Sequence, residues 1–449
     1  MAQISVVRKS QLEGAIRLDA EYYQPKYTNA VDAVRRYGTF SELGRIAKVL
    51  RGRNPRAYSD SGIPIIRAID LRDLTKTEDF LYANPVEELF FLKPKDILIS
   101  SIGAGSIGKV QVFQNAVKCA TVSEVSVVRS TDYNPYALAT FLRSKYGYLQ
   151  LERRITGSTG QLHLYPKDIV TVIVPLLPSS AQQTIEEINI EADREAQKSK
   201  ILYLQAEQLL LDEIGFKGLD LSHQVYWTVP FKKTKEAGRL DAEHFQPKFE
   251  RLLQHLASTG KSELLGNLVV QPIRRGLQPT YMEGGDVIVV NSKYVGKQFV
   301  NIEQAERSDL EFWQGSIRAQ ARKYDVIINS TGLGTIGRAN CILHDEKTVV
   351  DNHVTILRSD KQRCNPVYLA LYLNSKLGQM QTEKWLSGSS GQIEIYPPDL
   401  ARYVVYLSTM ESQQRIADLV IQSWEARQKA RRLLEEAKSK VEDLIGGKI

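Results

Sequence analysis

The sequence predicts an α+β protein in which two tandem-duplicated α/β globular regions are separated by two long helices that pair as an antiparallel coiled coil. Three observations predict this class. The chain repeats its motifs in order, each copy ends in an amphipathic run without Pro or Gly, and short apolar runs alternate with helix signals in each copy. We expect globular regions at 1–178 and 217–410, and spacer helices at 179–216 and 411–449.

The duplication is visible in motifs that return in the same order. RLDAE at 17–21 returns at 239–243, SIGAGSIGK at 101–109 returns as STGLGTIGR at 330–338, and GSTGQ at 157–161 returns as GSSGQ at 388–392. The unit is therefore about 230 residues long and is present twice. Residues 45–95 and 267–325 match poorly. Such a difference is expected if each copy presents the same fold to a different version of one ligand.

The two long runs, 182–214 and 413–445, carry apolar residues at steps of three, four and seven. Such spacing predicts amphipathic helices, each about 50 Å long at 1.5 Å per residue. One such helix cannot bury its apolar stripe alone, so pairing of the two is expected. The alternative is that each helix packs on its own globular region.

Within the globular regions, apolar runs predict buried strands and Asn-Pro pairs predict helices with Pro at the first position. The expected strands are 96–100, 125–128, 169–174, 325–330 and 354–357, and the expected helices are 134–142 and 365–373.

Composition excludes several classes of protein. With 43% hydrophobic and 25% charged residues, the 449-residue chain is not low-complexity or disordered. No apolar run is long enough to span a bilayer, the N-terminus has no signal-peptide core, and three cysteines are too few for a disulfide framework. We therefore expect a cytoplasmic protein that does not associate with membranes.

The basic excess is localised. Residues 1–178 hold 24 basic and 17 acidic residues and 217–410 hold 24 and 20, whereas 179–216 hold 3 and 8. The two globular regions are thus the basic parts of the chain, and a polyanionic partner is expected to contact them rather than the acidic helix.

The glycine-rich turns are not convincing nucleotide sites. Gly103-x-Gly105-x-x-Gly108 matches the dinucleotide fingerprint, but the residues that follow alternate as in a strand instead of opening a helix. Lys109 is followed by Val110, so the hydroxyl that holds magnesium in a phosphate loop is missing. A glycine-rich β-hairpin is expected, and a nucleotide-binding protein using the Gly103–Lys109 turn stays as the alternative function.

Catalytic motifs are also lacking. The sequence has no HExxH or GxSxG motif, and no Asn-Pro-Pro-aromatic segment of the kind with which an amino-methyltransferase holds a flipped base. We therefore expect no catalytic residue and no metal site in this chain.

The motif order resembles one known family. Each copy has a Ser-x-Gly-x-Gly-x-Ile-Gly-Lys/Arg turn, then Gly-Ser-Thr/Ser-Gly-Gln, then Gln-Gln-x-Ile at the start of a long helix. In this order, repeated once over essentially the whole chain, the motifs resemble those of the DNA-specificity subunits of type I restriction–modification systems. One departure is Pro-x-x-Pro at 175–178, which the second copy replaces with YLST at 406–409.

The resemblance implies a non-catalytic subunit. Its two globular regions would be target recognition domains that each read half of a split, asymmetric sequence in double-stranded DNA. Its paired helices would fix the unread gap and dock two methyltransferase subunits, with restriction/translocase subunits joining for cleavage. No cofactor is expected in this chain, because S-adenosylmethionine, ATP and Mg would bind the partner subunits.

Candidate DNA contacts are basic residues near the divergent stretches and the glycine turns, since arginine can bridge guanine O6 and N7. Surface charge that only aids solubility is the alternative interpretation. These candidates are Arg51, Arg53, Arg56, Arg67, Arg72 and Lys109 in the first copy, and Arg274, Arg275, Lys293, Lys297 and Arg338 in the second.

The Gly-flanked loops supply further candidates. Their polar side chains could contact phosphate or bases, or could buttress the joint between globular region and helix, whereas Tyr165 and Tyr396 are expected to be packing residues. The loop candidates are Ser158, Thr159 and Gln161, with Ser389, Ser390 and Gln392 in the second copy. A coiled-coil scaffold that binds protein alone is a third hypothesis for function.

Overall fold

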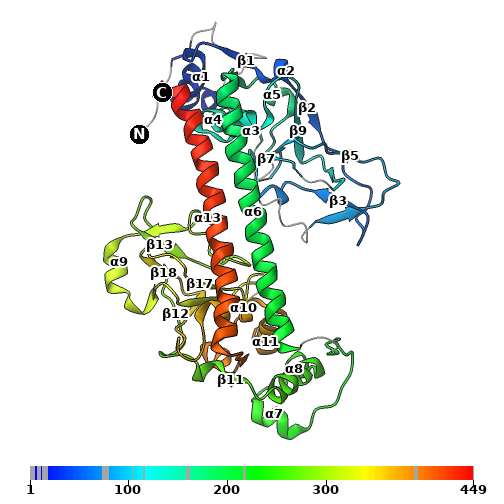
Figure 1. Ribbon diagram of the computed structural model, residues 1–449, viewed down its shortest axis with the longest axis vertical. Coiled ribbons are helices and arrows are strands. Elements are labelled where there is room, and N and C mark those ends of the chain that lie inside the picture. Colours follow the sequence, from blue (N-terminus) through cyan, green and yellow to red (C-terminus); the bar gives the residue numbers. More distant parts are fainter. Residues whose placement is uncertain are drawn as a thin grey trace. The chain divides into compact units, whose positions relative to one another are not determined.

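The computed structural model describes residues 6–7, 12, 19–72, 80–103, 105–114, 117–157, 162–215, 219–388 and 393–447. The chain forms two compact units: unit 1 is Met1–Gln197 with Arg427–Ile449, and unit 2 is Lys198–Ala426 (Figure 1). The division falls inside both long helices, so each unit holds one globular region and a part of each helix. The four segment boundaries expected from the sequence stay a prediction.

Unit 1 is built from three sheets. A two-stranded antiparallel sheet joins β1 (Phe40–Glu42) to β10 (Ile173–Pro175). A four-stranded antiparallel sheet has the order β2-β9-β6-β7, and a second four-stranded sheet has the order β4-β3-β8-β5, with β3 and β8 parallel. The strands are β2 (Ala47–Arg51), β3 (Ile63–Ile66), β4 (Leu81–Ala83), β5 (Phe90–Phe91), β6 (Ile97–Ser100), β7 (Val110–Val112), β8 (Ala120–Thr121) and β9 (Val125–Ser130).

Alternation along β6 builds two hydrophobic layers, because successive side chains of a strand point to opposite faces. Leu98 packs with Ile65 and Val127 between the two four-stranded sheets. Ile97 and Ile99 pack on the other face against helices. The helices of the globular region are η2 (Ala20–Tyr23), α1 (Pro25–Arg36), α2 (Leu43–Ile46), η3 (Asp70–Arg72), α3 (Pro135–Arg143), α4 (Lys145–Glu152) and α5 (Pro166–Ile169).

Unit 2 repeats the same topology. Its sheets have the orders β11-β20, β12-β19-β16-β17 and β14-β13-β18-β15, with β13 and β18 parallel. The strands are β11 (Ser262–Leu264), β12 (Arg274–Arg275), β13 (Val287–Val290), β14 (Glu306–Ser308), β15 (Gln320–Ala321), β16 (Val326–Asn329), β17 (Ala339–Cys341), β18 (Thr348–Val350), β19 (Val354–Leu357) and β20 (Val404–Tyr406).

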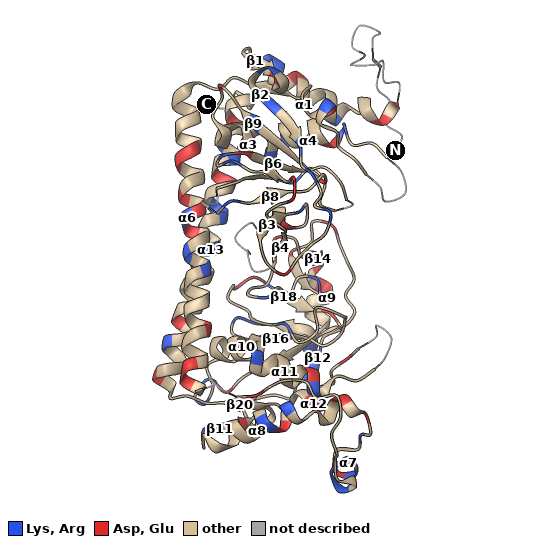
Figure 2. Cartoon of the chain, turned by 90° about the vertical axis from the view of Figure 1, so that its right-hand side faces the viewer, with Lys and Arg blue, Asp and Glu red and all other residues tan. Residues whose placement is uncertain are grey.

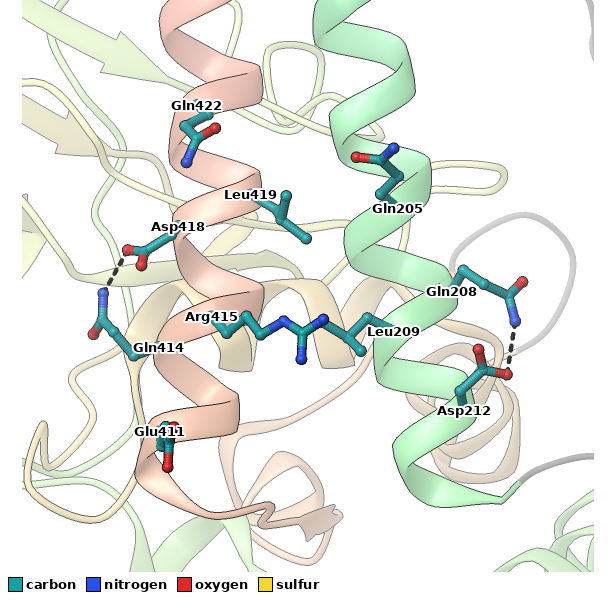
Figure 3. Close-up of a pocket in the computed structure, with 10 residues that line it drawn as sticks. All are labelled: Gln205, Gln208, Leu209, Asp212, Glu411, Gln414, Arg415, Asp418, Leu419 and Gln422. Carbon is teal, nitrogen blue, oxygen red and sulfur yellow. Dashed lines mark hydrogen bonds between the residues drawn. The ribbon is translucent and has the colours of Figure 1, made fainter.

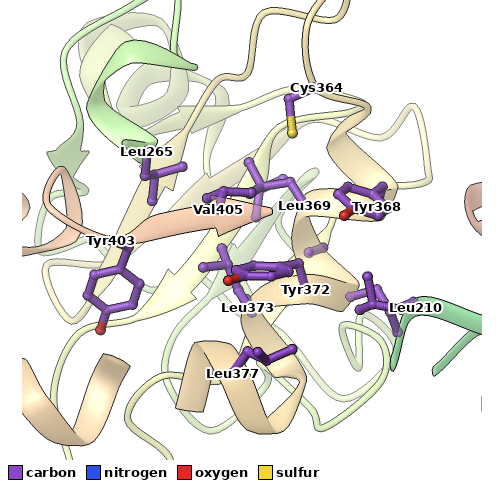
Figure 4. Packing of buried hydrophobic residues seen from close by; sticks show 14 of the residues in the cluster. Leu210, Leu265, Cys364, Tyr368, Leu369, Tyr372, Leu373, Leu377, Tyr403 and Val405 are labelled. Carbon is purple, nitrogen blue, oxygen red and sulfur yellow. The ribbon is translucent and has the colours of Figure 1, made fainter. Parts of the chain in front are cut away.

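The helices of unit 2 cover this scaffold in the same way. Tyr368, Leu369 and Tyr372 of α10 (Pro366–Asn374), the second of the two expected Asn-Pro helices, pack with Val405 and with Leu210 of a long helix (Figure 4). The helices are α7 (Phe231–Ala237), η5 (Ala242–Phe245), α8 (Pro247–Ser258), η6 (Leu265–Asn267), α9 (Leu310–Gly315), η7 (Ile317–Ala319), α10 (Pro366–Asn374), α11 (Lys376–Trp385) and α12 (Pro397–Leu400).

The long helices α6 (Ser179–Ile214) and α13 (Met410–Gly446) pack antiparallel, as expected. In unit 1, Lys429 Nζ lies 2.6 Å from Glu195 Oε1. In unit 2, Ser423 Oγ donates to the Ser199 carbonyl at 2.7 Å and Ser412 Oγ to Glu213 Oε1 at 2.6 Å. The same helices also join the core of the globular regions, so both packing interpretations hold at once.

The expected helices and most expected strands are confirmed, with one correction. The strand expected at 169–174 begins only at Ile173, because α5 occupies Pro166–Ile169 and buries Ile169 from a helical turn. Pro at the first helical position favours that turn over an extended start. Among the described residues, every helix is too short or too polar to cross a membrane.

Candidate nucleic-acid interface

The two copies share an Arg-Gly pair that the sequence comparison missed. In the β2–β9 ladder Arg51 lies opposite Ser126, and in the β12–β19 ladder Arg275 lies opposite Thr355. Ser126 and Thr355 are equivalent, because each bonds the serine that opens its glycine-rich turn. Arg51-Gly52 and Arg275-Gly276 therefore occupy the same place within the stretches 45–95 and 267–325. These stretches differ in sequence but share their strands.

Close backbone approach explains the glycines. A Cβ on Gly52 would lie 2.2 Å from the Val122 carbonyl oxygen, and one on Gly276 would lie 2.0 Å from that of Val350. A residue without Cβ is required at such contacts. The contact holds the strand end in place and so positions the arginine beside it.

In unit 1, Arg51 borders a polar hollow of about 660 Å³. Arg51 Nε donates to the Ser123 carbonyl at 3.0 Å, and Asn54 Oδ1 accepts from Ser123 N at 2.8 Å. Arg53 pairs with Glu88 at 2.5 Å, and this hydrogen bond, followed by the Arg53 charge, lowers the pKa of the Glu88 carboxyl. The hollow is lined by Arg51, Gly52, Arg53, Asn54, Glu88, Leu89, Phe90 and Ser123.

Guanidinium and amide groups of this kind are those that read base edges. Arg56, another candidate, is exposed beside the same region, where its backbone amide donates to Glu87 Oε2 at 2.6 Å. The hollow therefore brings Arg51 and Arg53 together, with Arg56 close along the chain.

In unit 2, Arg275 is held more firmly than Arg51. Its Nη2 donates to the Ile395 carbonyl at 2.9 Å and lies 3.3 Å from Glu394 Oε2, and its guanidinium lies 5.1 Å from the Tyr396 ring centroid. Tyr396 is 45% exposed, and in unit 1 Tyr165 is 37% exposed and stacks on His163. The predicted packing role of these tyrosines therefore holds at the surface rather than in the core, because Tyr165 packs on His163 and Tyr396 packs on Arg275.

The glycine-rich turns are β-hairpins. Gly103, Gly105 and Gly108 have φ of 109°, 81° and 81°, and the turn connects the antiparallel strands β6 and β7. The second turn connects β16 and β17 in the same way. Neither turn opens a helix in the described part of the chain, so a nucleotide phosphate would meet no helix N-terminus there. The alternative nucleotide-binding function has no support.

The described residues that flank the two Gly-flanked loops lie beside these hairpins. His163 forms β-bridges with Ile102 and Thr156, and Glu394 forms the equivalent bridges with Thr331 and Ser387. The bases of both loops thus lie next to the starts of the glycine turns. The loop candidates themselves lie outside the described residues: Ser158, Thr159, Gln161, Ser389, Ser390 and Gln392.

The remaining candidates are not brought together. Arg67 binds both carboxylate oxygens of Asp70 at 3.1 and 3.0 Å, so it is engaged within its own turn. Lys109 is half-buried at the end of its turn, and Arg338 donates to the Gly334 carbonyl at 2.8 Å. Lys293 is exposed over the Tyr294 ring, Lys297 is exposed, and the Arg72 side chain lies outside the description.

Side chains that could bind a metal do not gather in the described residues. These residues contain no group of three or more His, Cys, Asp or Glu side chains that could hold a metal. Burial raises the pKa of Cys119 to about 11 and that of Cys364 to about 12, so these thiols are protonated at neutral pH and are poor nucleophiles.

Within unit 2, a groove of about 850 Å³ runs between α6 and α13 (Figure 3). Leu209 and Leu419 line it together with amides and charges. Gln208 donates to Asp212 at 2.9 Å and Gln414 donates to Asp418 at 2.7 Å, so both acids already have partners. The groove is open, and its lining combines the apolar side chains of Leu209 and Leu419 with polar and charged groups.

Comparisons with known proteins give similar folds at low sequence identity. No family model matches the chain, and no curated protein matches it. The type I restriction–modification S subunit from M. genitalium is 12% identical, with a TM-score of 0.44 over 91% of this chain and 94% of that one. The HsdS subunit from Thermoanaerobacter tengcongensis is 13% identical, with a TM-score of 0.30 over 91% and 97%.

A third similar chain comes from a study of complex assembly and conformational transition of the type I R-M system. It is 13% identical, with a TM-score of 0.31 over 90% of this chain and 97% of that one.

Proposed function

We propose that this chain is the DNA-specificity subunit of a type I restriction–modification enzyme, which reads a bipartite, asymmetric target in double-stranded DNA and has no catalytic role itself. One observation carries the proposal: a single scaffold occurs twice, with the same Arg-Gly pair in each copy and different side chains around it. Arg51 has Arg53 and Glu88 as neighbours, whereas Arg275 has Glu394 and Tyr396. Two such surfaces on one chain suit two different half-sites.

The long helices would dock two methyltransferase subunits, and restriction/translocase subunits would join that complex. Support comes from the solvent-facing side of α6, where Ile190, Ile201 and Leu204 are 38%, 55% and 49% exposed. Apolar residues left exposed on a helix that already has a partner favour a further protein contact. S-adenosylmethionine, ATP and Mg would bind those partners, in the cytoplasm.

Methylation mapping tests the proposal directly. Co-expression with a cognate methyltransferase subunit is expected to methylate adenine in one split motif, and Arg51→Gln with Arg53→Gln should relax or abolish recognition of one half of it. Arg35→Gln with Arg36→Gln, two exposed arginines in the last turn of α1 that do not line the hollow, is a matched control that should leave the motif unchanged. Absence of any split motif, with complexes that form independently of DNA and salt, would favour a protein-binding scaffold instead.

A further inference from the structure

Unit 2 carries an arginine cluster around the short strand β12. Arg274 lies in β12, Arg318 in η7 and Arg322 directly after β15, and the short strand β12 is basic throughout (Figure 2). Arg318 Nη2 lies 3.4 Å from the Arg275 carbonyl oxygen, which places η7 against β12. Arg358 follows β19, the strand paired with β12. Four guanidinium groups from different elements therefore share one region.

Electrostatics agrees with this geometry. Burial lowers the pKa of Arg274, and the charges of Arg358, Arg318 and Arg322 lower it further, while Asp325 opposes them. Asp325 is already occupied, because Arg358 binds both of its oxygens at 2.7 and 2.6 Å. In the part of the chain that the structure describes, Arg274, Arg318 and Arg322 form no ion pair with a carboxylate.

Unit 1 keeps the scaffold but lacks the cluster. Asp96 and Arg129 form the pair equivalent to Asp325 and Arg358, also at 2.6 Å. The ladder position of Arg274, opposite Ile356, corresponds to that of Leu50, opposite Val127. The strands β5 and β15 are also equivalent, since each pairs antiparallel with the equivalent strand β8 or β18. Glu88 lies two residues before β5 and Arg318 lies two residues before β15, so these two positions correspond.

At the third position the side-chain change is smaller, because a lysine in unit 1 corresponds to an arginine in unit 2. Lys93 donates its backbone amide to Asp96 Oδ2 at 2.8 Å, and Arg322 does the same to Asp325 Oδ2 at 2.8 Å. Three arginines in unit 2 thus replace a leucine, a glutamate and a lysine in unit 1. The buried ion pair beside these positions is retained in both units. The shared scaffold therefore does not itself require the three arginines.

We propose that Arg274, Arg318 and Arg322 bind the phosphodiester backbone of DNA, so that unit 2 supplies a salt-dependent part of the affinity that the equivalent positions of unit 1 do not supply. The inference rests on the proposed function and adds a division of labour to it. Clustered like charges repel one another, and a polyanion relieves that repulsion. Arg318 and Arg322 are exposed, as a ligand running along the surface requires.

The test measures binding of the full chain to a short duplex of random sequence as a function of salt. Each lost phosphate contact reduces the slope of log K against log salt by about 0.9. The Arg318→Gln, Arg322→Gln double variant, which changes exposed side chains and should fold normally, is expected to lower the slope by about 2. Adding Arg274→Gln should lower it by about one more.

The matched control changes three cations that already have partners in the same unit. Lys232 and Lys233 pair with Glu236 and Glu250, and Lys235 lies over the Phe231 ring. Replacing all three with Gln should leave the slope close to that of the wild type. An equal slope for the arginine variants and wild type would overturn the inference while leaving the proposed function standing. Absence of duplex binding by the wild type itself would overturn both.

A gain-of-function variant approaches the same question from unit 1. Leu50→Arg with Glu88→Arg recreates two of the three positions there and should steepen the salt dependence. An unchanged slope in this variant would count against the assignment of these scaffold positions to phosphate binding.

Discussion

At the scale of single residues, a buried glutamine side chain in each unit forms the two backbone hydrogen bonds that a neighbouring strand would otherwise form. The Gln150 amide donates to the Ile173 carbonyl and accepts from the Ile173 amide, both at 2.9 Å. Gln381 bonds Val404 in the same way, but the Val404 carbonyl also accepts from Tyr372 Oη at 2.8 Å. The two sites therefore differ in how much bonding a substitution removes.

We predict that Gln150→Leu lowers the free energy of unfolding by about 2–6 kcal/mol, since it leaves two buried backbone groups of Ile173 unpaired and each such group costs about 1–3 kcal/mol. Gln381→Leu should cost less, because Tyr372 keeps the Val404 carbonyl bonded. Urea denaturation of both variants checks this, with Gln183→Leu at an exposed position as the control. A larger loss for Gln381→Leu than for Gln150→Leu would contradict the explanation.

His244 gives unit 2 a pH-dependent stability. Burial, followed by the Lys384 charge, lowers the pKa of His244 to about 4, and its Nδ1 lies 2.8 Å from the Lys384 carbonyl oxygen. An unfolded histidine has a pKa of about 6.5. Between pH 6.5 and 4 the unfolded chain therefore binds a proton that the folded chain does not, so this contribution to stability falls as the pH falls.

We predict that the wild type loses up to about 3 kcal/mol more than His244→Gln over that pH range, as one pKa unit corresponds to about 1.4 kcal/mol. Lys384 has its pKa lowered to about 8 by burial, so it stays protonated throughout the window and does not mask the effect. Denaturation curves at pH 7 and pH 4 provide the measurement. Parallel losses in the two proteins would show that His244 titrates normally.

At the scale of elements, a charge cluster joins the helix pair in unit 1. Lys429 Nζ lies 2.6 Å from Glu195 and 3.2 Å from Glu191, and Glu195 is buried. Lys429→Glu would place a third carboxylate there and is expected to lower the free energy of unfolding by more than the loss of an ordinary exposed ion pair does. Adding Glu195→Lys should restore part of the loss.

A double-mutant cycle by urea denaturation measures this coupling. The control is Lys440→Glu, which disturbs an exposed pair with Glu436 at 3.7 Å and should cost little. A loss for Lys429→Glu no greater than that of the control would show that the cluster contributes nothing to the pairing of α6 and α13.

The elements that the sequence predicted are those with local signals. Pro135 and Pro366 mark helix starts, glycines with positive φ mark the hairpins, and apolar steps mark α6 and α13. The α5 turn inside an apolar run was missed, because a short buried helix and a strand have the same composition.

Equivalent positions were also missed where side chains exchanged places. Tyr133 Oη donates to the Pro175 carbonyl at 2.9 Å, whereas the same bond in unit 2 comes from Tyr368 to the Tyr406 carbonyl at 2.7 Å. Alignment of residue types cannot detect such an exchange, nor the Arg51 and Arg275 equivalence, since both depend on strand register. The sequence therefore predicted the region and the residue types of the candidate site, but not which of those residues lie together.

At the scale of the whole molecule, the two long helices contribute equivalent residues to the hydrophobic cores of the two units. In unit 2 the C-terminal part of α6 contributes Ala206, Leu210 and Ile214 to the core that contains Ile416. In unit 1 the C-terminal part of α13 contributes Ala437, Val441 and Ile445 to the core that contains Ile185. These positions differ by the same 231 residues that separate the GSTGQ and GSSGQ motifs at their equivalent glutamines, Gln161 and Gln392.

One copy alone therefore carries both halves of the interface. A fragment of residues 1–216 keeps α6 but lacks α13. Ile185 then loses Ala437, Val441 and Ile445, and Leu210 and Ile214 lose the core that contains Ile416. A second copy placed antiparallel restores both contacts, and it also places Lys198, which is equivalent to Lys429, near Glu191 and Glu195. Such an interface is self-complementary, as a two-fold dimer requires.

We predict that this fragment is a dimer at micromolar concentration, as measured by sedimentation equilibrium. Leu210→Lys in the fragment should give a monomer, because it puts a charge into the pairing surface while leaving the globular region of unit 1 untouched. A wild-type fragment that stays monomeric would show that pairing depends on features that differ between α6 and α13. A fragment that dimerises and binds DNA should prefer a symmetric site, since both recognition surfaces are then the same.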